Sequence, residues 1–123
     1  DLHVEVPRLP ISDWRDSGPR ESSETVRTRV CRARELAIKR AGVCNALLGP
    51  NELKHAAPLH ESERALLERA VDRLGLSARA HQRILRVALT IADLEGCERV
   101  SGTHLMEAIG YRRLDRQPAV AAA

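Results

Sequence analysis

Residues 76–96, LSARAHQRILRVALTIADLEG, decide the fold class because they read as one long amphipathic helix. Ser77 is a suitable N-cap, and Gly96 is a suitable C-terminal stop. The apolar residues recur at helical spacing and predict the face that packs in a core: Ile84, Leu85, Ala88, Ile91, Ala92 and Leu94. The polar residues recur at steps of four, three, four and three: Arg79, Arg83, Arg86, Thr90 and Asp93. For this second face, solvent exposure is the simplest interpretation.

Arg79 occupies an unusual place in this predicted helix. With Ser77 as the N-cap, Arg79 is the second helical residue, where a cation meets the positive end of the helix dipole. That arrangement costs on the order of 0.3–1 kcal/mol. The free backbone N–H groups of a first turn and a guanidinium would together surround an anion such as a phosphate. Arg79 is therefore a candidate anion-binding residue.

The rest of the chain predicts further helices and no sheet. Periodic apolar residues, serine caps and glycine stops predict helical segments at about 23–41, 50–53, 61–74 and 102–111. In the first of these, the apolar stripe consists of Val26, Val30, Ala33, Ala37 and Ala41. We therefore predict an all-α fold, a small bundle of four to five helices.

The two ends of the chain differ from this helical part. Leu2, Val4 and Val6 alternate with polar residues, as in a strand, but no partner strand follows in the sequence. We predict an extended and linker segment over 1–20, a helical domain over 21–114 and a frayed tail over 115–123. Because the chain begins at Asp1 and its only methionine is Met106, we expect it to be part of a longer protein, with 1–20 as the remnant of a preceding domain.

The composition excludes several classes of protein. The 123 residues include no Phe, one Trp and one Tyr, so the core must be aliphatic. No apolar run approaches the roughly 18 residues that span a bilayer, and no signal peptide opens the chain, so we expect a soluble, cytoplasmic protein without a membrane partner. The three cysteines fit neither a disulfide framework nor a CxxC zinc pattern.

No motif for metal binding or catalysis occurs. The five histidines are scattered, and none pairs with another His or a Cys at helical spacing: His3, His55, His60, His81 and His104. A GxxxxGK loop followed by Ser or Thr is also missing. We therefore expect no metal site and no catalytic residue, and we do not expect this chain to hydrolyse a nucleotide by itself.

Nucleic-acid binding is a further hypothesis, and it rests on the basic residues of the first predicted helix. Residues 20–40 contain seven basic and three acidic residues. Such a helix could follow a phosphate backbone, with Arg27 and Arg34 as candidate contacts. The arginines are not confined to one face, however, and the chain lacks aromatic residues that stack on bases. An independent DNA-binding module, a protein-interaction bundle and a merely solvated basic helix all remain open.

Four stretches carry a family resemblance: GLSARAHQRILRVALTIADLEG at 75–96, HLMEAIGYRR at 104–113, DLHVEVPRLP at 1–10 and CNALLGPNEL at 44–53. The stretches at 75–96, 104–113 and 44–53 resemble the C-terminal domain of magnesium-chelatase-like AAA+ ATPases of the YifB and ComM type, and the stretch at 1–10 resembles the end of that family's ATPase core. The resemblance implies a helical lid that packs over a nucleotide held by a preceding ATPase core. It also implies that Arg79, in its S-x-R context, is the sensor-2 arginine.

The same resemblance implies the setting of the whole protein. The full-length chain would be an ATPase that uses ATP and Mg, with its Walker motifs upstream, whereas the present chain alone would bind no cofactor. Its partners would be the preceding core, the neighbouring subunits of a hexamer and DNA, in ComM-type branch migration. The arginines Arg27, Arg34, Arg83 and Arg86 are the candidates for nucleic-acid or subunit contacts.

Overall fold

A computed structural model describes residues 2–15 and 18–112 of the chain, and these residues form helices and no β-strand. The predicted all-α fold is confirmed. The elements are η1 (Ile11–Arg15), α1 (Ser23–Ala41), η2 (Asn45–Leu47), α2 (Pro50–Ala56), α3 (Glu61–Leu74), α4 (Ala78–Glu95) and α5 (Gly102–Gly110). The predicted frayed tail at 115–123 lies outside the described residues.

Short-range sequence signals set the ends of these helices. The Ser22 hydroxyl accepts a hydrogen bond from the Thr25 N–H at 3.1 Å, and the Ser77 hydroxyl accepts one from the Ala80 N–H at 3.2 Å. These contacts satisfy N–H groups that have no partner within the helix. At the other end, Gly75 and Gly96 adopt φ angles of 62° and 71°, a left-handed conformation that favours glycine. The predicted helix boundaries are therefore confirmed to within a residue or two, apart from the short segment at 50–53, which extends to Ala56.

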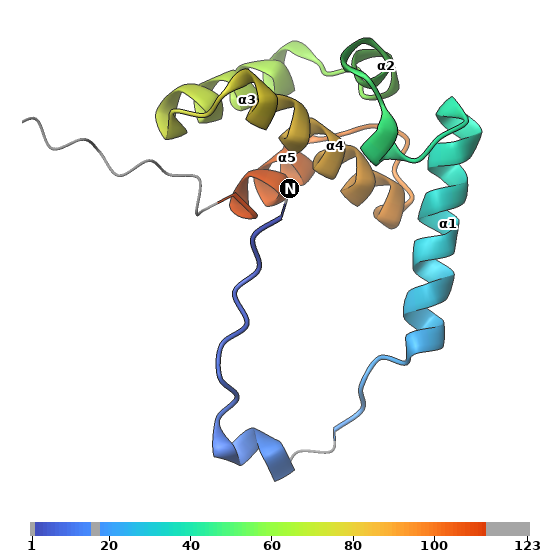
Figure 1. Cartoon of the computed structure of the whole chain (residues 1–123), viewed down its shortest axis with the longest axis vertical. Coiled ribbons are helices and arrows are strands. Elements are labelled where there is room, and N and C mark those ends of the chain that lie inside the picture. The colour runs from blue at the N-terminus through green and yellow to red at the C-terminus, as the bar shows by residue number, and fades with distance from the viewer. Residues whose placement is uncertain (1, 16–17, 113–123) are drawn as a thin grey trace, which may run out of the picture.

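α4 lies at the centre of the bundle and packs against α1, α2 and α5, while α3 packs against α5 (Figure 1). Of the predicted core residues of α4, all but one are buried. Leu94 is the exception, because 38% of its surface is exposed; the prediction for this residue is wrong. Leu89, which the apolar pattern left out, is only 2% exposed. The largest fully buried side chains of the bundle are Leu48, Leu53, Leu67, Ile84, Leu89 and Leu105.

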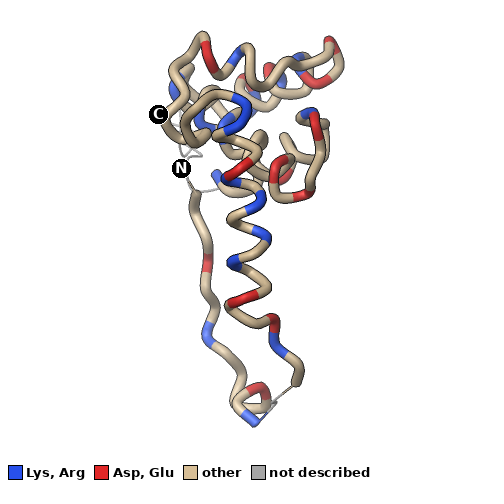
Figure 2. Tube along the Cα trace, turned by 90° about the vertical axis from the view of Figure 1, so that its right-hand side faces the viewer, with Lys and Arg blue, Asp and Glu red and all other residues tan. Residues whose placement is uncertain are grey.

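α1 joins the bundle through its C-terminal half only. Ala33 and Ala37 are buried, whereas Val26 and Val30, earlier on the same predicted stripe, are 37% and 50% exposed. Figures 1 and 2 show the N-terminal half of α1 extending beyond the other helices. Ala41, the last residue of the predicted stripe, is exposed too, so the prediction of a buried stripe is right for Ala33 and Ala37 and wrong for Val26, Val30 and Ala41.

The N-terminal segment has no regular structure from residue 2 to residue 10. A backbone hydrogen bond joins the His3 N–H to the carbonyl oxygen of Tyr111 at 2.8 Å, next to the end of α5. Leu2, Val4 and Val6 are exposed. The segment then turns through η1, a 3₁₀ helix that lies within the predicted extended and linker segment (Figure 1).

None of the helices in the described part of the chain is both long enough and apolar enough to cross a membrane.

Candidate functional site

Arg79 lies in the first turn of α4, one residue after the helix begins. Its side chain is exposed. Among the residues that the structure describes, the guanidinium has no hydrogen-bond or ion-pair partner. The Ser77 hydroxyl accepts a hydrogen bond from the Ala80 N–H. The earlier N–H groups of this first turn have no partner inside the helix. A guanidinium beside such a helix start favours an anion, and the role of Arg79 as a phosphate contact stays a prediction.

Arg86 does not extend this anion-binding surface. It is half-buried, and its Nε and Nη2 atoms donate to the carbonyl oxygen of Leu48 at 3.2 and 2.8 Å. Leu48 is buried and lies outside the helices, so its carbonyl oxygen has no helical N–H as a partner. Arg86 supplies the hydrogen bonds that this backbone group needs in the interior. Arg83 is also half-buried. The prediction that this polar stripe of α4 is solvent-exposed is therefore right for Arg79 and Thr90, only partly right for Arg83 and Arg86, and wrong for the buried Asp93.

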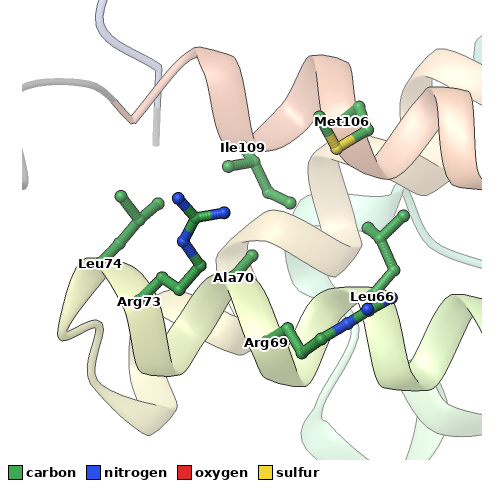
Figure 3. A pocket seen from close by; sticks show the side chains of 7 residues that line it. All are labelled: Leu66, Arg69, Ala70, Arg73, Leu74, Met106 and Ile109. Atoms are coloured by element: carbon green, nitrogen blue, oxygen red, sulfur yellow. The ribbon is translucent and has the colours of Figure 1, made fainter.

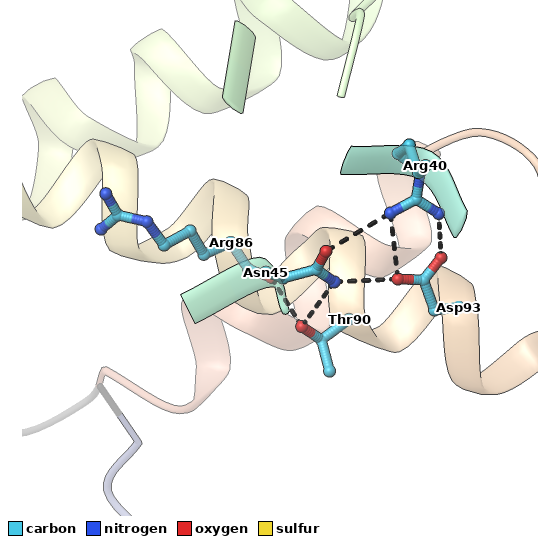
Figure 4. Close-up of polar contacts among 5 residues, drawn as sticks. All are labelled: Arg40, Asn45, Arg86, Thr90 and Asp93. Atoms are coloured by element: carbon cyan, nitrogen blue, oxygen red, sulfur yellow. Dashed lines mark hydrogen bonds and ion pairs between the residues drawn. The ribbon is translucent and has the colours of Figure 1, made fainter. Parts of the chain in front are cut away.

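The end of this stripe forms a polar network with α1 and η2 (Figure 4). Arg40 of α1 reaches both carboxylate oxygens of Asp93, one of them at 3.2 Å. The Asn45 amide donates to Asp93 at 2.8 Å and to the Thr90 hydroxyl at 3.1 Å, and its oxygen accepts from Arg40 at 3.3 Å. Thr90 in turn donates to the Arg86 carbonyl oxygen at 2.9 Å.

Burial makes this network important for the position of α1. Asp93 and Asn45 are both buried, and a buried carboxylate or amide is costly unless its polar atoms have partners. The partners come from three elements: Arg40 from α1, Asn45 from η2, and Thr90 and Asp93 from α4. The network therefore fixes α1 against the central helix. Sequence reasoning missed it because Arg40 was counted with the surface cations.

The basic residues of α1 do not form one uniform surface. Figure 2 shows them distributed along the helix with acidic residues between them. Arg40 belongs to the buried network, and Arg29 forms an ion pair with Glu21. The hydrogen bond from Arg29 lowers the pKa of Glu21, and the same contact raises the pKa of Arg29. Arg27 and Arg34 are exposed and lie seven residues apart, which places them on the same flank of α1.

The side chains of Glu95, Cys97 and His104 bring three possible metal-ligand atoms within 4.8 Å of one another. The hydrogen bonds of His104 argue against a metal there. Its Nδ1 accepts from the backbone N–H of Ser101 at 3.0 Å, which places the ring proton on Nε2. Nε2 then donates to the Glu95 carboxylate at 2.8 Å, so it has no free lone pair for a metal. The buried imidazole instead caps α5 and joins it to the end of α4.

Comparison with known sequences agrees with this architecture. The family profile described as "Magnesium chelatase, subunit ChlI C-terminal" matches residues 20–112. The competence protein ComM of Haemophilus influenzae is 44% identical over 117 residues, and the protein YifB of Salmonella typhimurium is 42% identical over 119 residues. Escherichia coli YifB is 41% identical over 117 residues. Each alignment covers 94% of this chain but only 23% of the relative, so the chain spans about a quarter of the length of these proteins.

Proposed function

The chain belongs to the family of the C-terminal domain of magnesium chelatase subunit ChlI, and we propose that it is the helical lid of an AAA+ ATPase. In this proposal Arg79 is the sensor-2 arginine, and it contacts the terminal phosphates of ATP bound to a preceding core. The observation that carries the proposal is the position of Arg79, which is exposed and without a partner among the described residues at the start of the central helix.

The contrast between Arg79 and Arg86 supports this assignment. Both belong to the same polar stripe of α4, but Arg86 donates to the Leu48 carbonyl oxygen, whereas the Arg79 guanidinium has no hydrogen-bond or ion-pair partner in the described part of the chain. The unfavourable interaction of the Arg79 charge with the helix dipole is not offset by a hydrogen bond or ion pair within the described part of the domain. A residue that breaks a local rule in this way is a candidate for a functional role. A phosphate would supply the missing contact.

Exposed apolar side chains support a preceding core domain. They gather on the N-terminal segment and on the projecting half of α1: Leu2, Val4, Val6, Leu9, Ile11, Trp14, Val26 and Val30. An exposed apolar surface of this extent is typical of an interaction site. Leu2, Val4 and Val6 alternate with polar residues in an extended segment that has no strand partner among the described residues. This pattern is typical of an edge strand, which here would join a sheet of another domain. We therefore assign this surface to contact with the ATPase core.

The residues of this chain would act on ATP through charge. The core would hold Mg and the nucleotide, and Mg would neutralise phosphate charge during phosphoryl transfer. Arg79 would add a positive charge at the terminal phosphates, where charge develops in the transition state. Because the network of Arg40, Asn45 and Asp93 fixes α1 to α4, a movement of Arg79 toward a phosphate would move α1 as well. The lid would thereby report the nucleotide state to its neighbours.

We further propose that the full-length protein assembles into a hexameric ring and processes DNA, as in branch migration. This part rests on the family resemblance and on one relative's name, Competence protein ComM. Arg27 and Arg34, exposed on one flank of α1, are the residues of this chain that we assign to contacts with DNA or with a neighbouring subunit.

The experiment that tests the lid proposal is ATP turnover by the longer protein with Arg79→Ala. We expect a loss of about tenfold or more, in line with the removal of one charge-stabilising group, without a change in the unfolding temperature. Arg99→Ala is the matched control, because Arg99 is also exposed but lies beyond the opposite end of α4. Turnover that is equal in the wild type and the Arg79 variant would contradict the proposal.

A further inference from the structure

A groove with apolar walls runs between α3 and α5 (Figure 3). Leu66, Ala70 and Leu74 form the α3 wall, and Met106 and Ile109 form the α5 wall. The groove has a volume of about 670 Å³, and Arg79 is not among the residues that line it. Met106, in the middle of α5, is 58% exposed. This apolar surface therefore faces outward and has no cover among the described residues.

The spacing of the wall residues fits a helix as the occupant. Leu66, Ala70 and Leu74 lie four residues apart on α3, so they form a straight row. Eight residues of helix extend about 12 Å, which corresponds to slightly more than two helical turns of a partner. Gly102, at the start of α5, lies close to the Leu66 side chain, since a Cβ on Gly102 would be 3.8 Å from it. A short amphipathic helix matches this length.

The charges at the groove are of one sign. Arg69 and Arg73, one turn apart on α3, are the charged residues that line it, and no acidic side chain does so. Figure 3 shows the Arg73 side chain extending from α3 toward α5 and Arg69 lying along α3 toward Leu66. Arg69 donates from Nε to the Ala65 carbonyl oxygen at 3.3 Å, which anchors it at the rim. An occupant with carboxylates along this side would be favoured.

We propose that the α3–α5 groove binds an amphipathic helix of a partner protein. The helix would place apolar residues, three and four positions apart, between Leu66 and Ile109, and acidic residues beside Arg69 and Arg73. Charge disfavours two nearer occupants. Residues 113–123 carry two arginines and one aspartate, and the exposed stripe of α1 is flanked by arginines, so both would bring positive charge to a basic groove.

The test uses two synthetic probe peptides that share the same leucine positions on a two- to three-turn helix. One carries glutamates along the flank and the other carries lysines. In a chemical-shift titration of the chain at low salt, we expect the glutamate peptide to give saturable shifts at Met106, Ile109, Leu66 and Leu74. The lysine peptide should bind at least tenfold more weakly. Absence of saturable shifts, or shifts located elsewhere, would overturn the proposal.

Charge-reversal variants make the test specific. Arg69→Glu with Arg73→Glu should weaken the glutamate peptide at least tenfold and should strengthen binding of the lysine peptide, while Arg99→Glu should change neither. Met106→Glu places a carboxylate on the apolar wall and should also weaken the glutamate peptide. Because Met106, Arg69 and Arg73 lie at the surface or rim, circular dichroism should show an unchanged helix content in each variant. An unchanged peptide affinity in the double variant would refute the charge argument.

Two other outcomes would assign the groove to a different occupant and overturn the proposal. Concentration-dependent self-association that Met106→Glu abolishes would identify a second copy of the chain. Groove resonances that shift when the chain is truncated after Arg112 would identify residues 113–123. The inference does not rest on the nucleotide role of Arg79. We therefore expect Arg79→Ala to leave peptide binding unchanged. Failure of one proposal is therefore distinguishable from failure of the other.

Discussion

Arg40 at the end of α1 and Asp93 in α4 lie 53 residues apart in the sequence, and the Arg40 guanidinium contacts both carboxylate oxygens of Asp93. Asn45 from η2 completes the arrangement by donating to the same carboxylate at 2.8 Å. The pair is the principal polar connection between the projecting helix and the central one. Together with the buried Ala33 and Ala37, it holds the C-terminal half of α1 against the bundle.

Asp93→Ala should destabilise the domain. The substitution removes the buried carboxylate that accepts from Arg40 and Asn45 and leaves the partly buried guanidinium without its counter-charge. Removing one partner of a buried ion pair typically costs 3–5 kcal/mol. Because about a quarter of the Arg40 side chain is exposed and can reach water, we expect a loss of about 2–4 kcal/mol in the free energy of unfolding. Urea denaturation measures it. Glu98→Ala, at an exposed acid just after α4, should change stability by less than about 0.5 kcal/mol.

Two arginines of α4 should respond differently to the same substitution. Arg86→Met removes both hydrogen bonds to the Leu48 carbonyl oxygen and should cost about 1.5–3 kcal/mol. Arg79→Met removes a cation from the first helical turn and breaks no contact with the described chain, so it should leave stability unchanged or raise it by about 0.3–1 kcal/mol. Thermal and urea unfolding of the two variants check this contrast. Equal losses would show that Arg79 is a structural residue.

Two leucines of α4 test whether burial, and not the apolar pattern of the sequence, determines the effect of a substitution on stability. Leu89→Ala should cost about 2–5 kcal/mol, because the residue is 2% exposed and its removal leaves a cavity. Leu94→Ala should cost less than about 1 kcal/mol, because the side chain is 38% exposed. Unfolding of each variant in urea measures the difference. A larger loss for Leu94 would contradict the burial described for the end of α4.

The titration of Tyr111 should reflect its contact with Glu107. The phenol donates a hydrogen bond to the Glu107 carboxylate at 3.0 Å, and this contact, with the negative charge of Glu107, raises the pKa of Tyr111 above its usual value of about 10. The folded state holds this proton more tightly, so the small stability that results is present below pH 10 and is lost as the pH rises through the folded pKa.

Absorbance measures this pKa cleanly, because Tyr111 is the only tyrosine of the chain. Glu107→Gln should move the pKa back toward 10. A pKa that is identical in the wild type and the variant would show that the contact does not persist in solution.

Much of the fold follows from short-range signals in the sequence. Ser22 and Ser77 accept hydrogen bonds at helix starts, and Gly75 and Gly96 end helices with positive φ. These effects act within one turn, so the chain shows them without knowledge of its tertiary contacts. The helix boundaries and the position of Arg79 were therefore predictable.

The surroundings of each face were not predictable in the same way. Periodicity shows which side of a helix is apolar, but it does not show what covers that side. Val26 and Val30 were expected in the core and are exposed, whereas Asp93 was expected at the surface and is buried. Both errors have one cause: α1 crosses α4 at its polar stripe and extends past the bundle. The partners of Asp93 come from positions 40 and 45, and no local pattern joins them to position 93.

The most direct test of the lid proposal compares ATP and ADP binding by the longer protein with and without Arg79→Ala. A guanidinium at the terminal phosphate of ATP interacts with a group that ADP lacks. We predict that the Kd for ATP rises about tenfold, equivalent to about 1.4 kcal/mol, while the Kd for ADP changes little. If the variant binds ATP as tightly as the wild type does, Arg79 does not contact the terminal phosphate and the proposed role is wrong.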